Sequence, residues 1–477
     1  MSLLNLSIFF FGILTSVFIF NYLTARLDRV YALFGVLLFF TIPIIIKLCI
    51  TAYVDLGLVF FSTAALFALF KWRDSKFNYR HLLISGFFCG MAMGTKYNGF
   101  ITFILLIFSI FYLFFKDPGK KKGVSRLLIG LMLFVLSAAA VYSPWGVRNY
   151  IWTGNPVYPL YNSAFNINSE NTCINSLELK NGENQNLSPL EYRRLIDHES
   201  WWEILLIPVR IFFEGKDNDF KYFDGKLTPV LFFLPMFAFV GILKTRNSIK
   251  HEKIVLLGYA VFFILISLSA TVARIRYLAP AIPALVILSI FGIHGIVCFM
   301  KENPTRHIAN KAGTIFILFV FIFQVVFCIN YLVNQYNYVQ PFPYLLGKIS
   351  RQDYISSYRP ENFAFEYINE NLSEDAKILF IYIGKRGYYC DRDYIPDNGN
   401  NIRLLYSISQ KDQSAARVVS EIKSQGITHI LISNRLFRQQ MKIDLNTQEE
   451  ILLKEFIYRF MKIKFDKKGF SLYELRI

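Results

Sequence analysis

Charged residues are scarce in this sequence. They make up 18% of its 477 positions, whereas hydrophobic residues make up 54% and aromatic residues 17%. A soluble enzyme of this length carries a larger share of charge on its surface. The composition excludes that class and predicts a membrane protein.

Short motifs that mark common cofactor sites are also missing. The six cysteines form no CxxC pair and no HExxH sequence occurs, so no structural zinc site is predicted. No glycine-rich phosphate loop occurs either, which argues against a cytosolic nucleotide-sugar site of the Rossmann kind. The one cofactor that the sequence leaves open is a divalent metal ion.

Long apolar runs are what the sequence does contain. Ten of them are counted as crossings of a hydrocarbon layer about 30 Å thick. They cover residues 4–23, 30–50, 53–70, 82–95, 97–115, 127–142, 227–243, 254–272, 278–300 and 314–333. The predicted fold class is an all-α polytopic membrane bundle of about ten spans, followed by a small C-terminal extracytoplasmic α/β domain.

Lys and Arg are divided unequally between the two sets of loops. The loops after the odd-numbered runs hold 18 of them, whereas the short loops on the other side hold only Lys96, Arg274 and Arg276. Because basic loops stay in the cytoplasm, the chain is predicted to lie in the inner or plasma membrane with its amino terminus outside. Much of the net charge of +17 is then a matter of topology, and no nucleic-acid partner is expected.

Two regions outside the membrane are predicted. Residues 1–333 form the multi-span domain, whose extracytoplasmic loop 146–226 contains an interfacial helix that starts near Ser188 and includes paired tryptophans. Residues 334–477 form the extracytoplasmic α/β domain, with helices expected over 361–372 and 414–425 and strands over 376–384, 428–434 and 470–477.

Asp55, in TAYVDLGLVFF, lies at the outer start of the third run. An acid at that depth is costly unless it is paired, hydrated or functional. It could favour the positive end of its own helix or pair with Lys47 across the turn. The functional interpretation is a carboxylate that holds a metal ion or an acceptor in an outer cavity.

Four basic residues face the same side as Asp55. Lys96 lies between Gly94 and Gly99, Arg274 and Arg276 lie in TVARIRYLAPAIP, and Arg148 follows the sixth run. Each could be an interfacial anchor, which is common for such residues. Together they favour a lipid-linked phosphate as the partner, because this side is otherwise poor in cations.

The order of four segments resembles the type C glycosyltransferase superfamily. They are TAYVDLGLVFF, GMAMGTKYNG, SPWGVRNYIWTGNPVYPL and RYLAPAIPAL, with an outer α/β tail after them. The groups most similar in pattern are the dolichyl-phosphate-mannose protein mannosyltransferases and the bacterial aminoarabinose transferases. The likeness covers most of the chain up to residue 333.

The resemblance implies an inverting enzyme that takes a sugar from a polyprenyl phosphate in the outer leaflet and gives it to an envelope lipid, glycan or protein. Asp55 matches the family's second outer acidic position, so it is the candidate catalytic residue and metal ligand. Lys96, Arg274 and Arg276 match basic positions near the donor phosphate, and Arg148 would lie at the same level.

The sequence departs from the family at its start. Members carry a further span and then an outer loop with an acidic catalytic motif, whereas the only acid before Asp55 here is Asp28, which the topology places in the cytoplasm. We therefore expect a chain that lacks an amino-terminal part and its general base. The alternative function is a non-catalytic lipid-phosphate carrier or assembly partner on the same scaffold.

Overall fold

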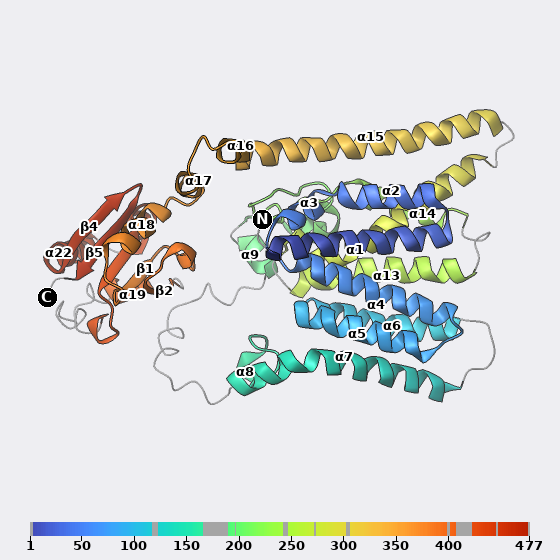
Figure 1. The fold of residues 1–477 in the computed structure, drawn as a ribbon, viewed down its shortest axis with the longest axis horizontal. Coiled ribbons are helices and arrows are strands. Elements are labelled where there is room, and N and C mark those ends of the chain that lie inside the picture. Colours follow the sequence, from blue (N-terminus) through green and yellow to red (C-terminus); the bar gives the residue numbers. More distant parts are fainter. Residues whose placement is uncertain are drawn as a thin grey trace. The chain divides into compact units, whose positions relative to one another are not determined.

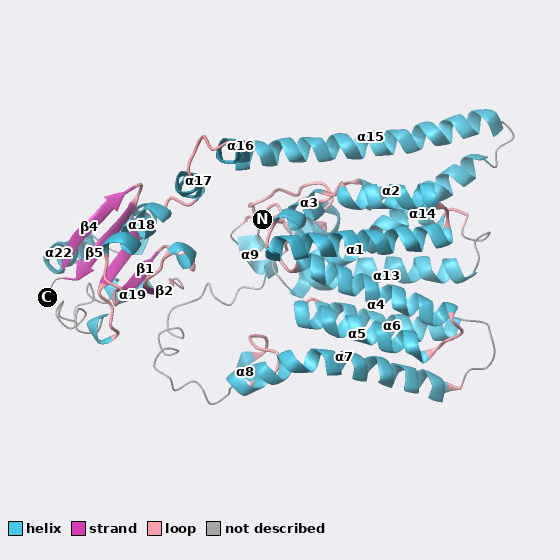
Figure 2. Ribbon diagram, viewed as in Figure 1, coloured by secondary structure: helices cyan, strands magenta, loops and turns pink. Residues whose placement is uncertain are grey.

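The structure is a computed structural model that describes residues 3–116, 123–165, 189–195, 197–241, 247–270, 273–301, 306–397, 401–406, 422–444 and 447–475. The chain divides into two compact units, Met1–Gln335 and Tyr336–Ile477. The first is helical and the second contains a β-sheet (Figures 1 and 2). This architecture confirms the predicted fold class.

The first unit is a bundle of helices. Its long members are α1 (Leu3–Arg26), α2 (Arg29–Phe40), α4 (Asp55–Asp74), α5 (Tyr79–Thr95), α6 (Gly99–Lys116), α7 (Val124–Thr153), α13 (Asn247–Ala270), α14 (Ile282–Lys301) and α15 (Arg306–Val339). Its shorter members are α3 (Pro43–Ile50), α8 (Asn162–Phe165), α9 (Pro189–Leu195), α10 (Trp201–Leu205), α11 (Ile207–Arg210), α12 (Val230–Met236), η2 (Phe237–Phe239) and η4 (Ile275–Ala281).

Seven helices of the described residues are long and apolar enough to cross a membrane, or eight if α2 and α3 together form one broken span. The expectation was about ten. The run 30–50 bends by 65° between α2 and α3, where Pro43 opens the second helix. The runs 82–95 and 227–243 form α5, of 17 residues, and the short pair α12 and η2. Both are shorter than the roughly 20 residues that a straight helix needs to cross the hydrocarbon layer.

Glycines let α5 pack closely against α7. A Cβ atom at Gly86 would lie 2.4 Å from the carbonyl oxygen of Phe134, and one at Gly90 would lie 2.5 Å from that of Ala138. Small residues at this spacing allow two helix backbones to approach within a membrane. This contact fixes α5, whose last turn leads to Lys96.

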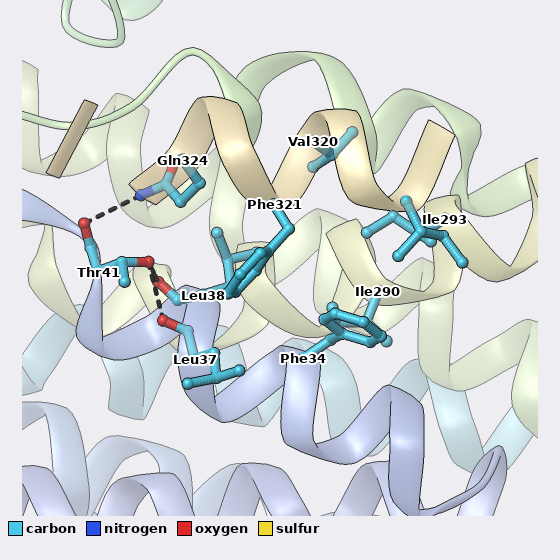
Figure 3. A pocket seen from close by; sticks show the side chains of 10 residues that line it. Phe34, Leu37, Leu38, Thr41, Ile290, Ile293, Val320, Phe321 and Gln324 are labelled. Atoms are coloured by element: carbon cyan, nitrogen blue, oxygen red, sulfur yellow. Dashed lines mark hydrogen bonds between the residues drawn. The ribbon is translucent and has the colours of Figure 1, made fainter. Parts of the chain in front are cut away.

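α15 is held to the bundle through Gln324. Its amide Nε2 donates to the carbonyl of Thr41 at 3.0 Å, and its Oε1 accepts from Thr228 at 2.8 Å. Figure 3 shows Gln324 at one end of a narrow apolar pocket between α2, α14 and α15, with Phe34, Phe321 and Ile290 along it. Because a buried amide without partners is costly, this pair of bonds sets the register of α15.

In the described residues of the predicted outer loop 146–226, the chain forms the short helices α8, α9, α10 and α11 after the end of α7, rather than one long interfacial helix. α9 begins at Pro189, while Ser188 lies outside the described residues. In the described residues, a capping box joins Ser200 to Glu203 at the start of α10. Trp201 and Trp202 are exposed on α10.

The second unit is built on a five-stranded mixed sheet with the strand order β2-β1-β3-β5-β4. Its strands are β1 (Lys377–Ile381), β2 (Asp393–Ile395), β3 (His429–Ser433), β4 (Met461–Lys467) and β5 (Phe470–Leu475). Its helices are α16 (Pro341–Leu345), α17 (Arg351–Tyr358), α18 (Asn362–Asn371), η5 (Gly387–Tyr389), α19 (Asn401–Tyr406), α21 (Asn434–Asp444) and α22 (Thr447–Phe460). β1 pairs in parallel with β2 and β3, and β5 runs antiparallel to β3 and β4.

Each face of this sheet has its own core because side chains alternate along a strand. Ile378 and Phe380 of β1 pack with Phe365 of α18 on one face. Leu379 and Ile381 pack with residues of α19, α21 and α22 on the other. The expected elements at 361–372, 376–384, 428–434 and 470–477 are confirmed, and most of the expected helix at 414–425 lies outside the described residues.

Candidate functional site

Several helix ends meet at one end of the bundle. α4 begins there at Asp55, α5 ends there at Thr95, and η4 packs against α3, α4 and α13. η4 carries the RIRY segment, with Arg274 as its N-cap residue. This arrangement brings two short loops that are far apart in the sequence to the same place.

Asp55 is paired with Lys96. The Nζ atom of Lys96 lies 2.5 Å from Oδ1 of Asp55, whose side chain is almost completely buried. The possible pairing of Asp55 with Lys47 is wrong, because Lys47 lies 2.8 Å from Asp217 and 3.2 Å from Asp224 instead. A buried carboxylate of this kind needs such a partner, because the transfer of an isolated carboxylate out of water costs on the order of several kcal/mol.

The ring of Tyr277 lies among the cations. Lys96 Nζ is 4.2 Å from its centroid, and the guanidinium carbons of Arg276 and Arg274 are 5.1 and 5.9 Å away. The backbone of Tyr277 is fixed by Ser267, whose hydroxyl donates to its carbonyl at 3.3 Å. The aromatic face lets three positive groups approach one another in a partly desolvated place.

Arg274 and Arg276 each lie against a second ring. Arg274 stacks 4.4 Å from the centroid of Phe220, and Arg276 stacks 4.4 Å from that of Tyr53. The Nε atoms of both arginines are buried and have no hydrogen-bond partner among the described residues. Such donors are rare in native structures, so each one calls for an explanation, and the binding of an anion at this place is one.

Arg148 is placed apart from this group. It is exposed near the end of α7 and stacks 4.8 Å from the ring of Trp152, with no hydrogen bond or ion pair in the part of the chain that the structure describes. Its neighbour Asn149 donates to the hydroxyl of Tyr97 at 3.3 Å, and Tyr97 follows Lys96 directly. The structure thus brings together Asp55, Lys96, Arg274 and Arg276 but not Arg148.

The loop after α7 packs on the same region. α7 is followed by its C-cap residue Gly154, whose φ of 69° lies in the left-handed region that favours glycine. Asn155 is fully buried, accepting from the amide of Val157 at 2.9 Å and donating to the carbonyl of Leu160 at 2.8 Å. The hydroxyl of Tyr97 donates to the carbonyl of Tyr158, so this loop is tied to the residue beside Lys96.

A second group of charged residues was missed by the sequence interpretation. It lies in residues 214–226, EGKDNDFKYFDGK, which we call the acidic loop. Asp217 accepts hydrogen bonds from Lys47 at 2.8 Å, from Tyr331 at 2.8 Å and from Gln335 at 2.5 Å. Three aspartates between two glycines were the available signal, but nothing in the sequence named their partners.

The acidic loop supports the arginines directly. Its Phe220 provides the ring under Arg274, and its Phe223 carbonyl accepts from the amide of Ile275 at 2.8 Å. The loop also closes on itself tightly, since a Cβ atom at Gly215 would lie 2.4 Å from the carbonyl oxygen of Gly225. Asp217 therefore holds the surface on which Arg274 rests.

A buried charge cluster holds the acidic loop from another side. Arg193 donates two hydrogen bonds of 2.7 Å to Glu199, and Arg210 donates one of 3.1 Å. Burial raises the pKa of Glu199, but the hydrogen bonds and charges of the two arginines outweigh it and hold this pKa below its ordinary value. Arg193 also donates to the carbonyl of Lys221 in the acidic loop at 2.8 Å.

The surroundings of Asp55 do not fit a divalent metal ion. In the described ranges, no three His, Cys, Asp or Glu side chains come together in a way that could hold one. Asp55 is paired with a lysine, and that lysine shares the ring of Tyr277 with Arg276. Hard divalent cations need several oxygen ligands, which this group does not supply.

Comparison with known proteins supports a resemblance to sugar transferases. A model of the family described as dolichyl-phosphate-mannose-protein mannosyltransferase matches residues 3–145. This match confirms the predicted resemblance for that part of the chain, which includes Asp55 and Lys96. No curated protein matches the sequence.

Solved structures are similar over nearly the whole chain, at low identity. ArnT from Cupriavidus metallidurans in the apo state is 13% identical over 98% of this chain and 83% of its own, with a TM-score of 0.49. The same protein bound to undecaprenyl phosphate gives a TM-score of 0.46. The archaeal oligosaccharyltransferase AglB from Archaeoglobus fulgidus, in complex with an inhibitory peptide and a dolichol-phosphate, is 13% identical over 98% of this chain and 62% of its own, with a TM-score of 0.45.

Proposed function

We propose that this chain is an integral-membrane glycosyltransferase that takes a sugar from a polyprenyl-phosphate donor and transfers it on the extracytoplasmic side. The acceptor is an envelope lipid, glycan or protein. The observation that carries the proposal is the pair of buried Nε groups of Arg274 and Arg276. Neither has a hydrogen-bond partner among the described residues, and both arginines share the ring of Tyr277 with Lys96.

The charges of the site favour a phosphate. Lys96, Arg274 and Arg276 supply three positive charges, and Asp55 neutralises one of them. Guanidinium groups bind phosphate oxygens in a fork of two N–H donors, and such charge-assisted bonds are about twice as strong as neutral ones. A phosphate would satisfy the two free Nε groups and the remaining positive charge at once.

An apolar cavity of about 450 Å³ supports a lipid-linked donor. It lies between α12, α13, α14 and the residues around α11, and its lining side chains are all apolar. Two of them, Ile264 and Leu265, lie within one turn of Ser267, which donates to the backbone of Tyr277. A hydrocarbon chain in this cavity would begin near the proposed phosphate site.

The proposed reaction is an inverting displacement. The acceptor oxygen forms a bond to the anomeric carbon as the bond from that carbon to the phosphate oxygen breaks, and the lipid phosphate leaves with the electron pair. Lys96, Arg274 and Arg276 stabilise the leaving phosphate. Lys96 has a flexible stem, so it moves from Asp55 toward the phosphate, and Asp55 then takes the proton of the acceptor hydroxyl.

Donor binding and sugar transfer are tested separately on the purified protein in proteoliposomes. Radiolabelled polyprenyl-phosphate sugars are added with an envelope extract, and both retained lipid and transferred sugar are measured. Binding together with transfer supports the proposal. Binding without transfer to any acceptor in the extract would instead indicate a lipid-phosphate carrier or an assembly partner, and neither binding nor transfer would reject both.

A further inference from the structure

A second cavity lies at the end of the bundle opposite to Asp55. Asp55 and Asp74 are the first and last residues of α4, so roughly 28 Å of helix separates them. The cavity has a volume of about 370 Å³, is bounded by α1, α4 and α5, and includes Asp74 in its lining. It therefore belongs to neither the proposed phosphate site nor its apolar cavity.

The cavity has a polar end and an apolar body. Asn21, Arg26, Lys71 and His81 lie at the polar end, near the ends of their helices. Phe18, Phe67 and Phe88 line the body, and Ala64 and Ala68 leave room between them. From Ala64 to Asp74 the cavity extends about 15 Å along α4, which is about half of a hydrocarbon layer.

Of the three basic groups at the polar end, one is engaged and two have no side-chain partner among the described residues. Arg26 is fully engaged, since it donates to Glu252 at 3.0 and 2.8 Å and to Asp74 at 2.6 Å. Neither Nζ of Lys71 nor the ring of His81 has a hydrogen-bond or ion-pair partner within the described part of the chain. The free groups at the mouth are thus hydrogen-bond donors, and one of them is a cation.

We propose that this cavity binds an anionic phospholipid, with one acyl chain along Phe18, Phe67 and Phe88 and the phosphate at Lys71 and His81. An apolar void that opens at the membrane interface is filled by hydrocarbon rather than water. A free ammonium group at headgroup level attracts a phosphate by about 1 kcal/mol before any hydrogen bond forms. Arg26, held by Asp74 and Glu252, forms the fixed rim of the mouth.

The test is a titration of the purified full chain, in nonionic detergent, with fluorescent phosphatidylglycerol. Unlabelled phosphatidylglycerol should displace the probe, whereas phosphatidylcholine and inorganic phosphate should not. Lys71→Glu should raise the Kd about 10-fold or more, because it removes a charge-assisted bond and adds repulsion. Ala68→Phe should also weaken binding, because it fills the space for the chain without changing charge.

Lys116→Glu is the matched control. Lys116 is exposed at the end of α6 and does not line the cavity, so the same charge change there should leave the Kd within about twofold. Equal effects of Lys71→Glu and Lys116→Glu would mean that only the general surface charge matters, and the proposal would be overturned. Displacement by phosphatidylcholine or inorganic phosphate, or no binding at all, would overturn it as well. Should Ala68→Phe not fold, Lys71→Glu decides, because its side chain is exposed.

Discussion

Lys96 donates a 2.5 Å hydrogen bond to Asp55, which precedes it by 41 residues. The carboxylate opens α4 and the lysine follows α5, so the pair closes the end of a helical hairpin. The same lysine lies 4.2 Å from the ring of Tyr277, which brings η4 to the pair. One contact therefore joins three segments of the site.

Replacing one partner of this pair should be more harmful to stability than replacing both. Lys96→Met leaves Asp55 as a buried, unpaired charge and should cost about 3–5 kcal/mol, whereas Lys96→Met with Asp55→Asn should recover most of that loss. The loss is measured as thermal or denaturant unfolding in detergent. A double variant as unstable as Lys96→Met would show that the ion pair is not what burial of Asp55 requires.

Substitution of Asp55 distinguishes its proposed role as a general base from a role in positioning Lys96. Asp55→Asn should leave donor-lipid binding within a few fold and reduce transfer by about 10²- to 10⁴-fold, because a general base acts in the chemical step. The two quantities are measured side by side in proteoliposomes. If donor binding fell as far as transfer, Asp55 would serve to position Lys96 and not to accept a proton.

Arg274→Ala and Arg276→Ala should each weaken binding of polyprenyl phosphate by about 1.5–3 kcal/mol, the scale of a hydrogen bond to a charged group. Lys at either position should restore only part of the affinity, because its ammonium lacks the planar fork. Arg148→Ala is the control, since Arg148 is exposed and lies outside the group. Equal losses for all three variants would point to a general surface effect.

Asp217→Asn should weaken phosphate binding although Asp217 is not one of the residues proposed to bind the phosphate. Asp217 accepts hydrogen bonds from Lys47, Tyr331 and Gln335. Its loop also carries Phe220, whose ring packs against Arg274. Loss of its charge leaves Lys47 underpaired and should also lower stability by about 2–3 kcal/mol. Both effects are read from lipid-binding and unfolding measurements.

Asp219→Asn on the same loop provides the comparison. Asp219 pairs with Lys216, whose side chain is 67% exposed, so this pair should contribute less than about 1 kcal/mol. Normal phosphate binding by Asp217→Asn, or an equal loss of binding with Asp219→Asn, would show that Asp217 does not support the phosphate site.

Hydropathy alone predicted most of the bundle, because a membrane span needs a long apolar run and most of these runs lie in long helices. It did not predict where a run would break. Residues 30–50 read as one continuous span, yet Pro43 bends the chain by 65° between α2 and α3. A single proline changes the direction of a helix without changing its mean hydropathy.

The sequence indicated that Lys96, Arg274 and Arg276 share one side of the membrane, since loop charge reports sidedness. The sequence did not indicate which of these side chains contact one another. Lys47 is nearer to Asp55 in the sequence than Lys96 is, but it pairs with the acidic loop, 170 residues away. Which helix ends meet depends on the packing of the whole bundle, and local spacing carries no information about it.

The orientation of the chain can be read by thiol labelling. In a variant without the six native cysteines, a cysteine at Ser357 should react with a membrane-impermeant maleimide in intact spheroplasts, whereas one at Ser125 should react only after lysis. Ser125 opens α7 at the basic end, and Ser357 lies in α17 of the second unit. The opposite labelling pattern would place the candidate site in the cytoplasm and exclude an extracytoplasmic donor.

The stability of the second unit should fall as the pH decreases below about 6.5, the ordinary value for histidine. His429 opens β3 and is buried, and burial lowers its pKa although Glu474 acts in the opposite direction. The unfolded chain then binds a proton in a pH range where the folded chain does not, so stability is complete above the unfolded value and declines as the pH falls toward the folded one. Carboxylates elsewhere also titrate on acidification, and His429→Gln separates their contribution from that of His429.

Unfolding of the full chain, followed in detergent at a series of pH values, should show a steeper loss of stability with falling pH for the native chain than for His429→Gln. Parallel curves for the two would mean that His429 is protonated as easily in the folded sheet as in the unfolded chain.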